Sequence, residues 1–128
     1  MSGLTTAAVS FQTMHSFVMH MESLNVIPGT LSMLILKTLS RESLHGYAIA
    51  HRIKRSSGDQ LQVEEGSLYP ALQRMLAMRW VTAEWVPAGP KRRARVYSLT
   101  PLGRRQLAAE VSEFSRAVAA TTRVIQPA

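Results

Sequence analysis

Apolar positions recur at helical spacing in three short segments of the chain. The first runs from Thr30 to about Leu39, the second from about Gly46 to Ser56, and the third begins near Gly66. In the third segment the apolar residues stand at i, i+4, i+7 and i+8 and so share one helix face: Leu68, Leu72, Met75 and Leu76. The pattern predicts three amphipathic helices. Pro70 is compatible with the third if it lies in the first turn, where N–H groups lack intrahelical partners.

After Trp80 the period changes from helical to alternating. Residues 81–86 and 94–99 alternate as strands do, and Pro87 to Arg93 between them form a loop of turn-forming residues followed by cations. A short extended piece at 61–63 precedes the third helix. The order helix, turn, helix, hairpin predicts a winged helix-turn-helix, a mainly α fold with a small β-hairpin, over residues 28–100.

The last element begins with Thr100 as a helix cap and Pro101 at the first helical position. We expect Gly103 to weaken its first turn slightly. Further along, residues recur with a period of about 3.5, the spacing of a coiled-coil seam: Leu107, Val111, Phe114, Val118, Thr121 and Ile125. The seam predicts a dimerisation helix over residues 101–126. The alternative is a helix that lies back on its own domain.

Residues 1–24 show no clear period and contain four methionines. We expect either a poorly ordered leader, with Met21 or another internal methionine as the translation start, or an extra helix from about Ala7 to Met19 that packs on the dimer. No basic segment followed by an apolar run precedes a cleavage site, so a signal peptide is not expected.

Composition limits the classes of protein. A chain of 128 residues with 46% hydrophobic residues suits one folded domain. The absence of cysteine excludes disulfides, thiolate metal sites and thiol nucleophiles, and it fits a cytoplasmic protein. No stretch reaches the roughly 18 consecutive apolar residues of a membrane span, so no membrane association is expected.

The positive charge is unevenly distributed. The net charge is +7, yet residues 1–36 contain only one charged residue, Glu22. Four cations stand within five residues near the predicted hairpin tip: Lys91, Arg92, Arg93 and Arg95. Such a cluster favours contact with nucleic-acid phosphates, whereas a generally basic, solvated surface would spread the charge more evenly.

Three runs of residues resemble a known family. They are Leu44-His45-Gly46-Tyr47, the run from Val63 to Leu72 with Gly-Ser-Leu-Tyr-Pro at its centre, and the run from Arg93 to Thr100 followed by Gly103. Together they resemble the PadR family of bacterial transcriptional regulators. The resemblance covers about Pro28 to the C-terminus. It implies a homodimeric winged-helix repressor that binds pseudo-palindromic operators, and the single C-terminal helix implies the short subfamily. Val96 departs from the family pattern, since a second aromatic residue is common there.

The third helix and the hairpin hold the candidate DNA-binding residues. A recognition helix presents its N-terminal residues to base edges. Ser67 and Tyr69 offer hydroxyls to phosphates, although Tyr69 could instead brace the helix. Gln73 and Arg74 are long enough to reach bases, where Gln pairs with adenine and Arg with guanine, or they are solvated surface residues. The four hairpin cations would lie along phosphates or enter the minor groove, and alternation should place Arg93 and Arg95 on one face.

Two other functions stay open. A dimer cleft around Phe114 could bind a small hydrophobic or phenolic effector that releases DNA, or the chain could be a non-specific architectural DNA-binding protein. An enzyme is not expected, because no nucleophile with a base, phosphate-binding glycine loop or poised carboxylate pair is present. The four histidines lack metal-ligand spacing, so neither a metal nor a cofactor is expected. Tyr47 and Tyr97 are expected in the core or an interface.

Overall fold

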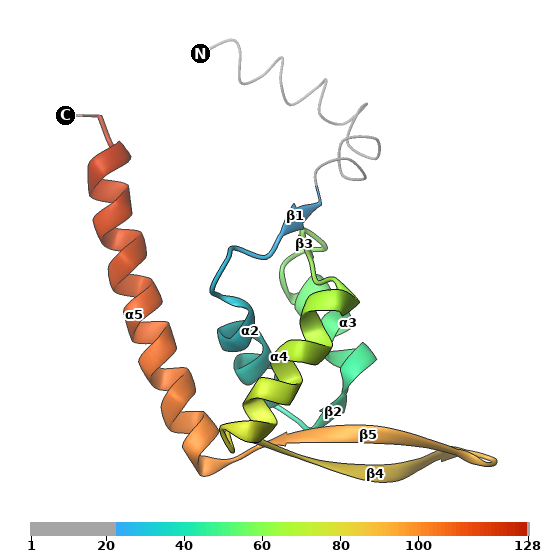
Figure 1. Cartoon of the computed structure of the whole chain (residues 1–128). Helices are drawn as coiled ribbons and strands as arrows, with labels where there is room; N and C mark the ends of the chain where they lie inside the picture. Colours follow the sequence, from blue (N-terminus) through green and yellow to red (C-terminus); the bar gives the residue numbers. More distant parts are fainter. Residues whose placement is uncertain (1–22, 128) are drawn as a thin grey trace, which may run out of the picture.

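The computed structural model describes residues 23–127, which fold as four helices and five strands (Figure 1). The helices are α2 (Leu31–Leu39), α3 (Gly46–Ser56), α4 (Glu65–Ala77) and α5 (Pro101–Ile125). The strands are β1 (Leu24–Asn25), β2 (Leu44–His45), β3 (Leu61–Gln62), β4 (Val81–Gly89) and β5 (Arg92–Leu99). The predicted fold class, mainly α with a small β-hairpin, is confirmed, and the order of elements is that of a winged helix-turn-helix. The alternatives for residues 1–22 lie outside the described residues.

Local sequence signals account for most helix ends. The α3 helix has the predicted bounds, and α5 begins after Thr100, whose Oγ1 accepts a hydrogen bond from the Gly103 N–H at 3.0 Å. Helix α4 begins at Glu65, one residue before the predicted start, so Pro70 lies in its second turn. The expectation that Pro70 falls in the first turn was therefore wrong. The carbonyl of Gly66, four residues earlier, receives no backbone N–H from this position.

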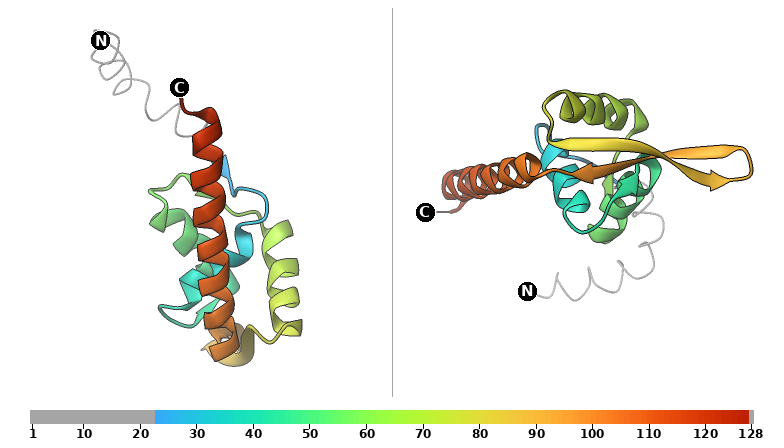
Figure 2. Two further views of the ribbon diagram at one scale, coloured as in Figure 1. Left: turned by 90° about the vertical axis from the view of Figure 1, so that its left-hand side faces the viewer. Right: turned by 90° about the horizontal axis from the view of Figure 1, so that it is seen from below.

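Two small sheets connect the helices. In the larger one β5 pairs antiparallel with both β2 and β4, while β1 pairs parallel with β3. Strand β1 lies before Pro28, the residue at which the predicted pattern begins. The sequence did not predict this strand, because two residues are too few to show a periodic pattern. The long β4–β5 hairpin passes beneath the helices and projects beyond them, opposite to α5 (Figure 2).

The predicted hairpin loop was wrong in its extent. The strands continue to Gly89 and resume at Arg92, which leaves only Pro90 and Lys91 as the turn. A register shift between Pro87 and Gly89 accommodates the extra residue, and Gly89 adopts a φ of 138° that disfavours residues with a side chain. The hairpin is thus longer than predicted, and its cations lie on strands and a tight turn.

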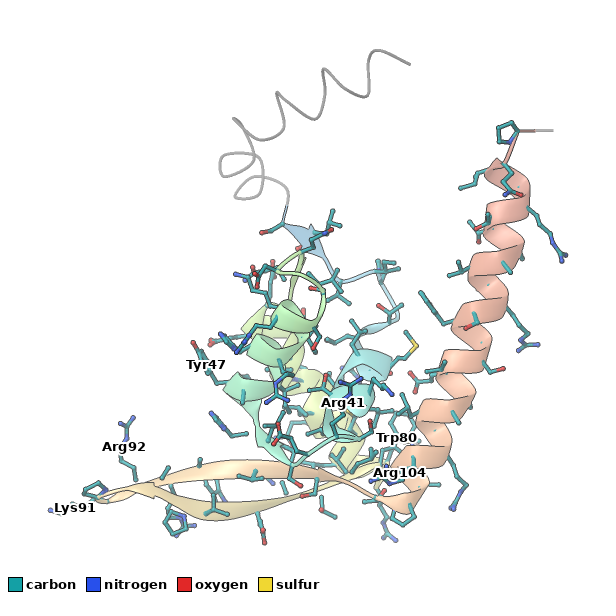
Figure 3. The ribbon with its side chains drawn as sticks, turned by 180° about the vertical axis from the view of Figure 1, so that it is seen from behind. Arg41, Tyr47, Trp80, Lys91, Arg92 and Arg104 are labelled. Carbon is teal, nitrogen blue, oxygen red and sulfur yellow. The ribbon has the colours of Figure 1, made fainter. Side chains whose placement is uncertain are left out.

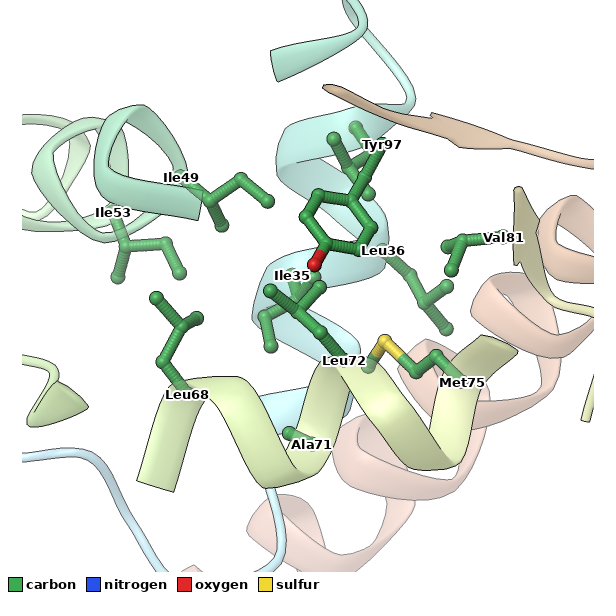
Figure 4. Packing of buried hydrophobic residues seen from close by; sticks show 11 residues of the cluster. Ile35, Leu36, Ile49, Ile53, Leu68, Ala71, Leu72, Met75, Val81 and Tyr97 are labelled. Atoms are coloured by element: carbon green, nitrogen blue, oxygen red, sulfur yellow. The ribbon is translucent and has the colours of Figure 1, made fainter. Parts of the chain in front are cut away.

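The core lies between α2, α3, α4 and the base of the hairpin (Figure 4). Its largest fully buried side chains come from all of these elements: Ile35, Leu36, Ile49, Leu68, Leu72, Met75 and Val81. The Tyr97 ring enters this cluster from β5 and is 3% exposed, as expected for a core aromatic residue. The core therefore fixes the base of the hairpin against the same helices that hold α4.

Candidate nucleic-acid interface

Helix α4 presents a polar face to solvent. Its apolar residues Leu68, Ala71, Leu72 and Met75 are buried, and all four candidate residues on the helix are exposed: Ser67, Tyr69, Gln73 and Arg74. Glu65 lies in the first turn, where the helix dipole favours negative charge. The buried apolar residues hold α4 against the core, and the exposed candidate residues are accessible to a ligand.

The four α4 residues do not share one direction. Ser67 lines a hollow of about 290 Å³ beside residues 25–31, whereas Tyr69 lines a hollow of about 490 Å³ between α3 and α4. Since successive helix residues turn by roughly 100°, Arg74 lies on the Ser67 side and Gln73, four residues after Tyr69, lies on the Tyr69 side. Gln73 and Arg74 therefore point in directions roughly 100° apart on the exposed face.

Tyr69 also packs on α3. A Cβ atom added to Gly46, the first residue of α3, would lie 2.8 Å from Tyr69 Cε1 and 3.1 Å from its hydroxyl oxygen. The ring is thus seated against a residue that must be small, while 44% of Tyr69 stays exposed. The geometry supports the bracing role for Tyr69 and leaves its surface available to solvent.

Sequence reasoning missed a polar face of α3. Tyr47, His51 and Lys54 line the hollow that Tyr69 also lines, and Tyr47 stacks with His51 at 6.2 Å between ring centroids. Tyr47 is 67% exposed, which excludes the core and leaves the interface, the other place expected for it. Figure 3 shows it projecting on the side toward which the hairpin extends. The i, i+4, i+7 spacing of these residues was the signal available in the sequence.

The hairpin cations lie beyond the helical body. Figure 3 shows Lys91 at the tip and Arg92 projecting from it on the side of the helices. Arg93 and Arg95 share one face, as predicted, because both guanidinium groups lie over the Trp85 ring, at 5.5 and 5.8 Å from its centroid. Within residues 23–127 the ion pair found is Arg52 with Glu42, and no hairpin cation takes part in one. The hairpin charge is therefore not neutralised by neighbouring carboxylates.

Helix α5 divides into two parts. Leu107 packs against the core of its own domain, and the Ser32 hydroxyl donates to Glu110 at 2.6 Å, which ties α2 to α5. Beyond Phe114, which is half-buried, the seam residues Val118 and Ile125 are exposed, and Thr121 lies between them on the same stripe. Val111 is exposed as well. The helix therefore lies back on its domain only over its N-terminal part and projects beyond the domain (Figure 1). The projecting part carries the exposed apolar residues Val118 and Ile125.

A hollow of about 440 Å³ separates the start of α2 from α5. Phe114, Ala117 and Met33 supply its apolar lining, and Glu110 and Glu113 supply carboxylates. The hollow includes Phe114, around which a possible effector cleft of the dimer was expected from the sequence. Elsewhere in the described part of the chain, no group of three or more His, Asp or Glu side chains has the arrangement of a metal site. No helix among residues 23–127 combines the length and apolar character needed to cross a bilayer.

Comparison with known proteins identifies the family. The profile of the "Transcriptional regulator PadR-like family" matches residues 35–109, more than half of the chain. The chain belongs to the PadR-like family. The matched segment extends from α2 to the start of α5 and includes α4 and the whole hairpin, so the candidate interface lies within the family's shared region.

Individual proteins are also similar to this chain. An uncharacterized 37.1 kDa protein in a transposon of Streptomyces fradiae is 42% identical over 84 residues, which make up 66% of this chain but only 23% of that protein. A PadR family transcriptional regulator from Eggerthella lenta superposes with a TM-score of 0.69 at 23% identity, over 95% of this chain and 100% of that one. Bacillus subtilis PadR, solved in complex with operator DNA, has a TM-score of 0.60 at 25% identity over 65% of this chain and 47% of that one. PadR-like proteins are described as transcriptional regulators, which agrees with the expectation that this chain is not an enzyme.

Proposed function

We propose that this PadR-like chain is a cytoplasmic, sequence-specific DNA-binding regulator that represses transcription as a homodimer on a pseudo-palindromic operator. One observation carries the proposal: a helix with an exposed polar face, α4, stands beside a projecting hairpin whose cations lack ion-pair partners among the described residues. A major groove admits a helix of this kind, and phosphates attract the hairpin. The complex of Bacillus subtilis PadR with operator DNA supports the same assignment.

Helix α4 and the β4–β5 hairpin have different roles in DNA recognition. Gln73 and Arg74 have side chains that pair in two-pronged fashion with adenine and guanine, so they read sequence. Ser67, Tyr69 and the α3 residues Tyr47 and Lys54 flank them with hydroxyl and ammonium groups suited to phosphates. Lys91, Arg92, Arg93 and Arg95 bind the backbone or the minor groove with little regard to sequence.

Substitutions in the two elements should therefore have different effects. Arg74→Ala or Gln73→Ala is expected to relax the base preference at one operator position and to cost about 1–3 kcal/mol of operator binding. Arg92→Ala is expected to weaken operator and random DNA by the same factor. Competition binding with single-base operator variants measures both effects. Equal losses on operator and random DNA for all three variants would contradict the division, and would instead favour a non-specific architectural protein.

The exposed stripe of α5 is the proposed dimer interface. A projecting helix with Val111, Val118 and Ile125 uncovered exposes apolar surface that a second copy can bury along the seam. Leu107 and Phe114 join the stripe to the domain, since both are partly buried against it. A symmetric pair would place two recognition helices on one operator.

Val118→Asp should convert the dimer to monomers, because it places a charge in the middle of the stripe. Ala120→Asp is the matched control, since Ala120 is exposed on another side of the same helix turn. Light scattering at micromolar concentration measures the mass. A monomer for the first variant and a dimer for the second are expected, whereas two dimers would move the interface elsewhere. Phe114→Asp is expected to give monomers as well, although it also disturbs the contact with α2.

A sensory role is a second candidate. The hollow lined by Met33, Phe114 and Ala117 has a volume in the range of small-molecule sites and adjoins the proposed interface. A hydrophobic or phenolic effector bound there would act on the angle between α5 and the DNA-binding domain. The two carboxylates in its lining favour effectors with hydroxyl or amine donors over acids.

A further inference from the structure

Trp85, Arg93 and Arg95 share one face of the hairpin. Register pairs Ala83 with Tyr97 and Trp85 with Arg95, and side chains alternate between the two faces of a strand. At the base of the hairpin Tyr97 and Val81 belong to this face and enter the helical core, and beyond the core the hairpin twists (Figure 2).

Trp85 lies uncovered between two arginines. Arg95 is its direct cross-strand partner and Arg93 is diagonal to it, and both guanidinium groups lie within the roughly 6 Å that marks a cation–π contact. Arg95 also lies 5.9 Å from the Tyr97 ring centroid. Trp85 is nevertheless 57% exposed, so the ring that contacts the two arginines lies at the protein surface.

The group that lies against an arginine side chain determines whether the guanidinium group can still attract phosphate. A carboxylate would hold a guanidinium group in place but would also cancel its attraction for phosphate. An aromatic ring restricts the side chain and leaves the full charge and most N–H donors directed outward. Arg95 Nε is buried and has no hydrogen-bond partner within residues 23–127, so its guanidinium group is held mainly by stacking.

We infer that Trp85 is a positioning residue for DNA binding: its ring orders Arg93 and Arg95 on one face of the hairpin before they meet phosphates. Two long side chains ordered in advance lose less conformational freedom on binding. The inference rests on the proposed DNA-binding function for its consequence, but the ordering itself is a property of the free protein.

The ordering of Arg93 and Arg95 by Trp85 can be tested in the free protein. In nitrogen-15-labelled protein, the Nε–H signals of Arg93 and Arg95 should be shifted by the ring current of Trp85 and should be sharp enough to assign. Trp85→Leu is expected to move both signals toward the position of solvated arginine, while Thr82→Leu, an exposed change on the other face of β4, leaves them unchanged. Unshifted signals in the native protein would overturn the inference, whatever the chain binds.

The effect of this ordering on DNA affinity can be tested by binding measurements. Since an exposed cation–π contact is worth roughly two- to five-fold in an equilibrium constant, Trp85→Leu should weaken operator and random DNA alike by about 10-fold in a dimer with two hairpins. Trp85→Phe, which keeps a ring, should recover most of that decrease. In a background with Arg93→Gln and Arg95→Gln, Trp85→Leu should have an effect below about two-fold.

The outcomes distinguish the ordering of the arginines from the binding of DNA. A decrease of about 10-fold that persists in the double-glutamine background would show that Trp85 contacts DNA itself and would overturn the positioning role. A protein with shifted arginine signals and no affinity for any DNA would instead refute the proposed function and retain the ordering by Trp85.

Discussion

Gly103→Ala is expected to lower the free energy of unfolding by about 3 kcal/mol, the upper part of the range for overpacked sites. A Cβ at this position would overlap the carbonyl oxygen of Trp80 and lie 2.6 Å from Leu99 Cδ1. The Trp80 carbonyl belongs to the backbone and already accepts hydrogen bonds from the N–H and Oγ1 of Thr100, so it cannot move cheaply. Urea denaturation followed by circular dichroism measures the change.

Gly66→Ala is the matched control for this prediction. Gly66 also lies in a helix, but nothing stands within 4 Å of its added Cβ. Alanine is favoured over glycine in helices by about 1 kcal/mol, so this variant should be more stable than the native protein. If Gly103→Ala were also stabilised, helix propensity would dominate at that position, and the tight junction between α5 and the Trp80 carbonyl would not exist.

Salt should weaken DNA binding by about 10³- to 10⁵-fold between 50 and 200 mM, the range for a dimer that binds roughly 6 to 10 phosphates. The reason is that each neutralised phosphate releases counterions from the duplex. Replacing Arg92 and Arg93 by Gln removes two cations from each hairpin of the proposed dimer. The negative slope of log K against log salt should then become shallower by about 0.9 for each phosphate that is no longer neutralised.

The control for charge itself is Arg116→Gln with Arg123→Gln. Both residues are exposed on α5, so this variant removes the same charge far from the hairpin. Its slope is expected to stay close to that of the native protein, with fluorescence anisotropy as the measurement. A nearly flat salt dependence in the native protein would refute phosphate contact, and equal slopes in the two variants would refute the particular role of the hairpin.

Elements defined by local pattern could be predicted from the sequence. The apolar spacing of α3 and the breakers after it predicted its bounds as found, and the cap at Thr100 located the start of α5. The buried spacing of α4 also predicted which of its residues would be exposed, because the opposite face of an amphipathic helix follows from the apolar one.

Features that depend on distant residues could not be predicted in this way. Gly103 was expected only to weaken a helix turn, because the Trp80 carbonyl against which it packs is brought there by the fold. Tyr47 was expected in the core or an interface, and the sequence could not decide between them; the fold leaves it exposed beside the hollow between α3 and α4. The stacking of two arginines on Trp85 depends on strand register, which a hairpin bulge shifts by one residue.

Selection of bound fragments from random DNA examines specificity, symmetry and spacing together, and so bears on the whole proposal of a dimeric, sequence-specific regulator. We expect an enriched pseudo-palindrome with half-sites about one helical turn, roughly 34 Å, apart, as two recognition helices of a symmetric dimer require. We also expect Gln73→Ala to change the enriched bases at one symmetric pair of positions. Recovery of fragments with no common sequence would contradict sequence-specific regulation, and an enriched site without two-fold symmetry would contradict the dimer.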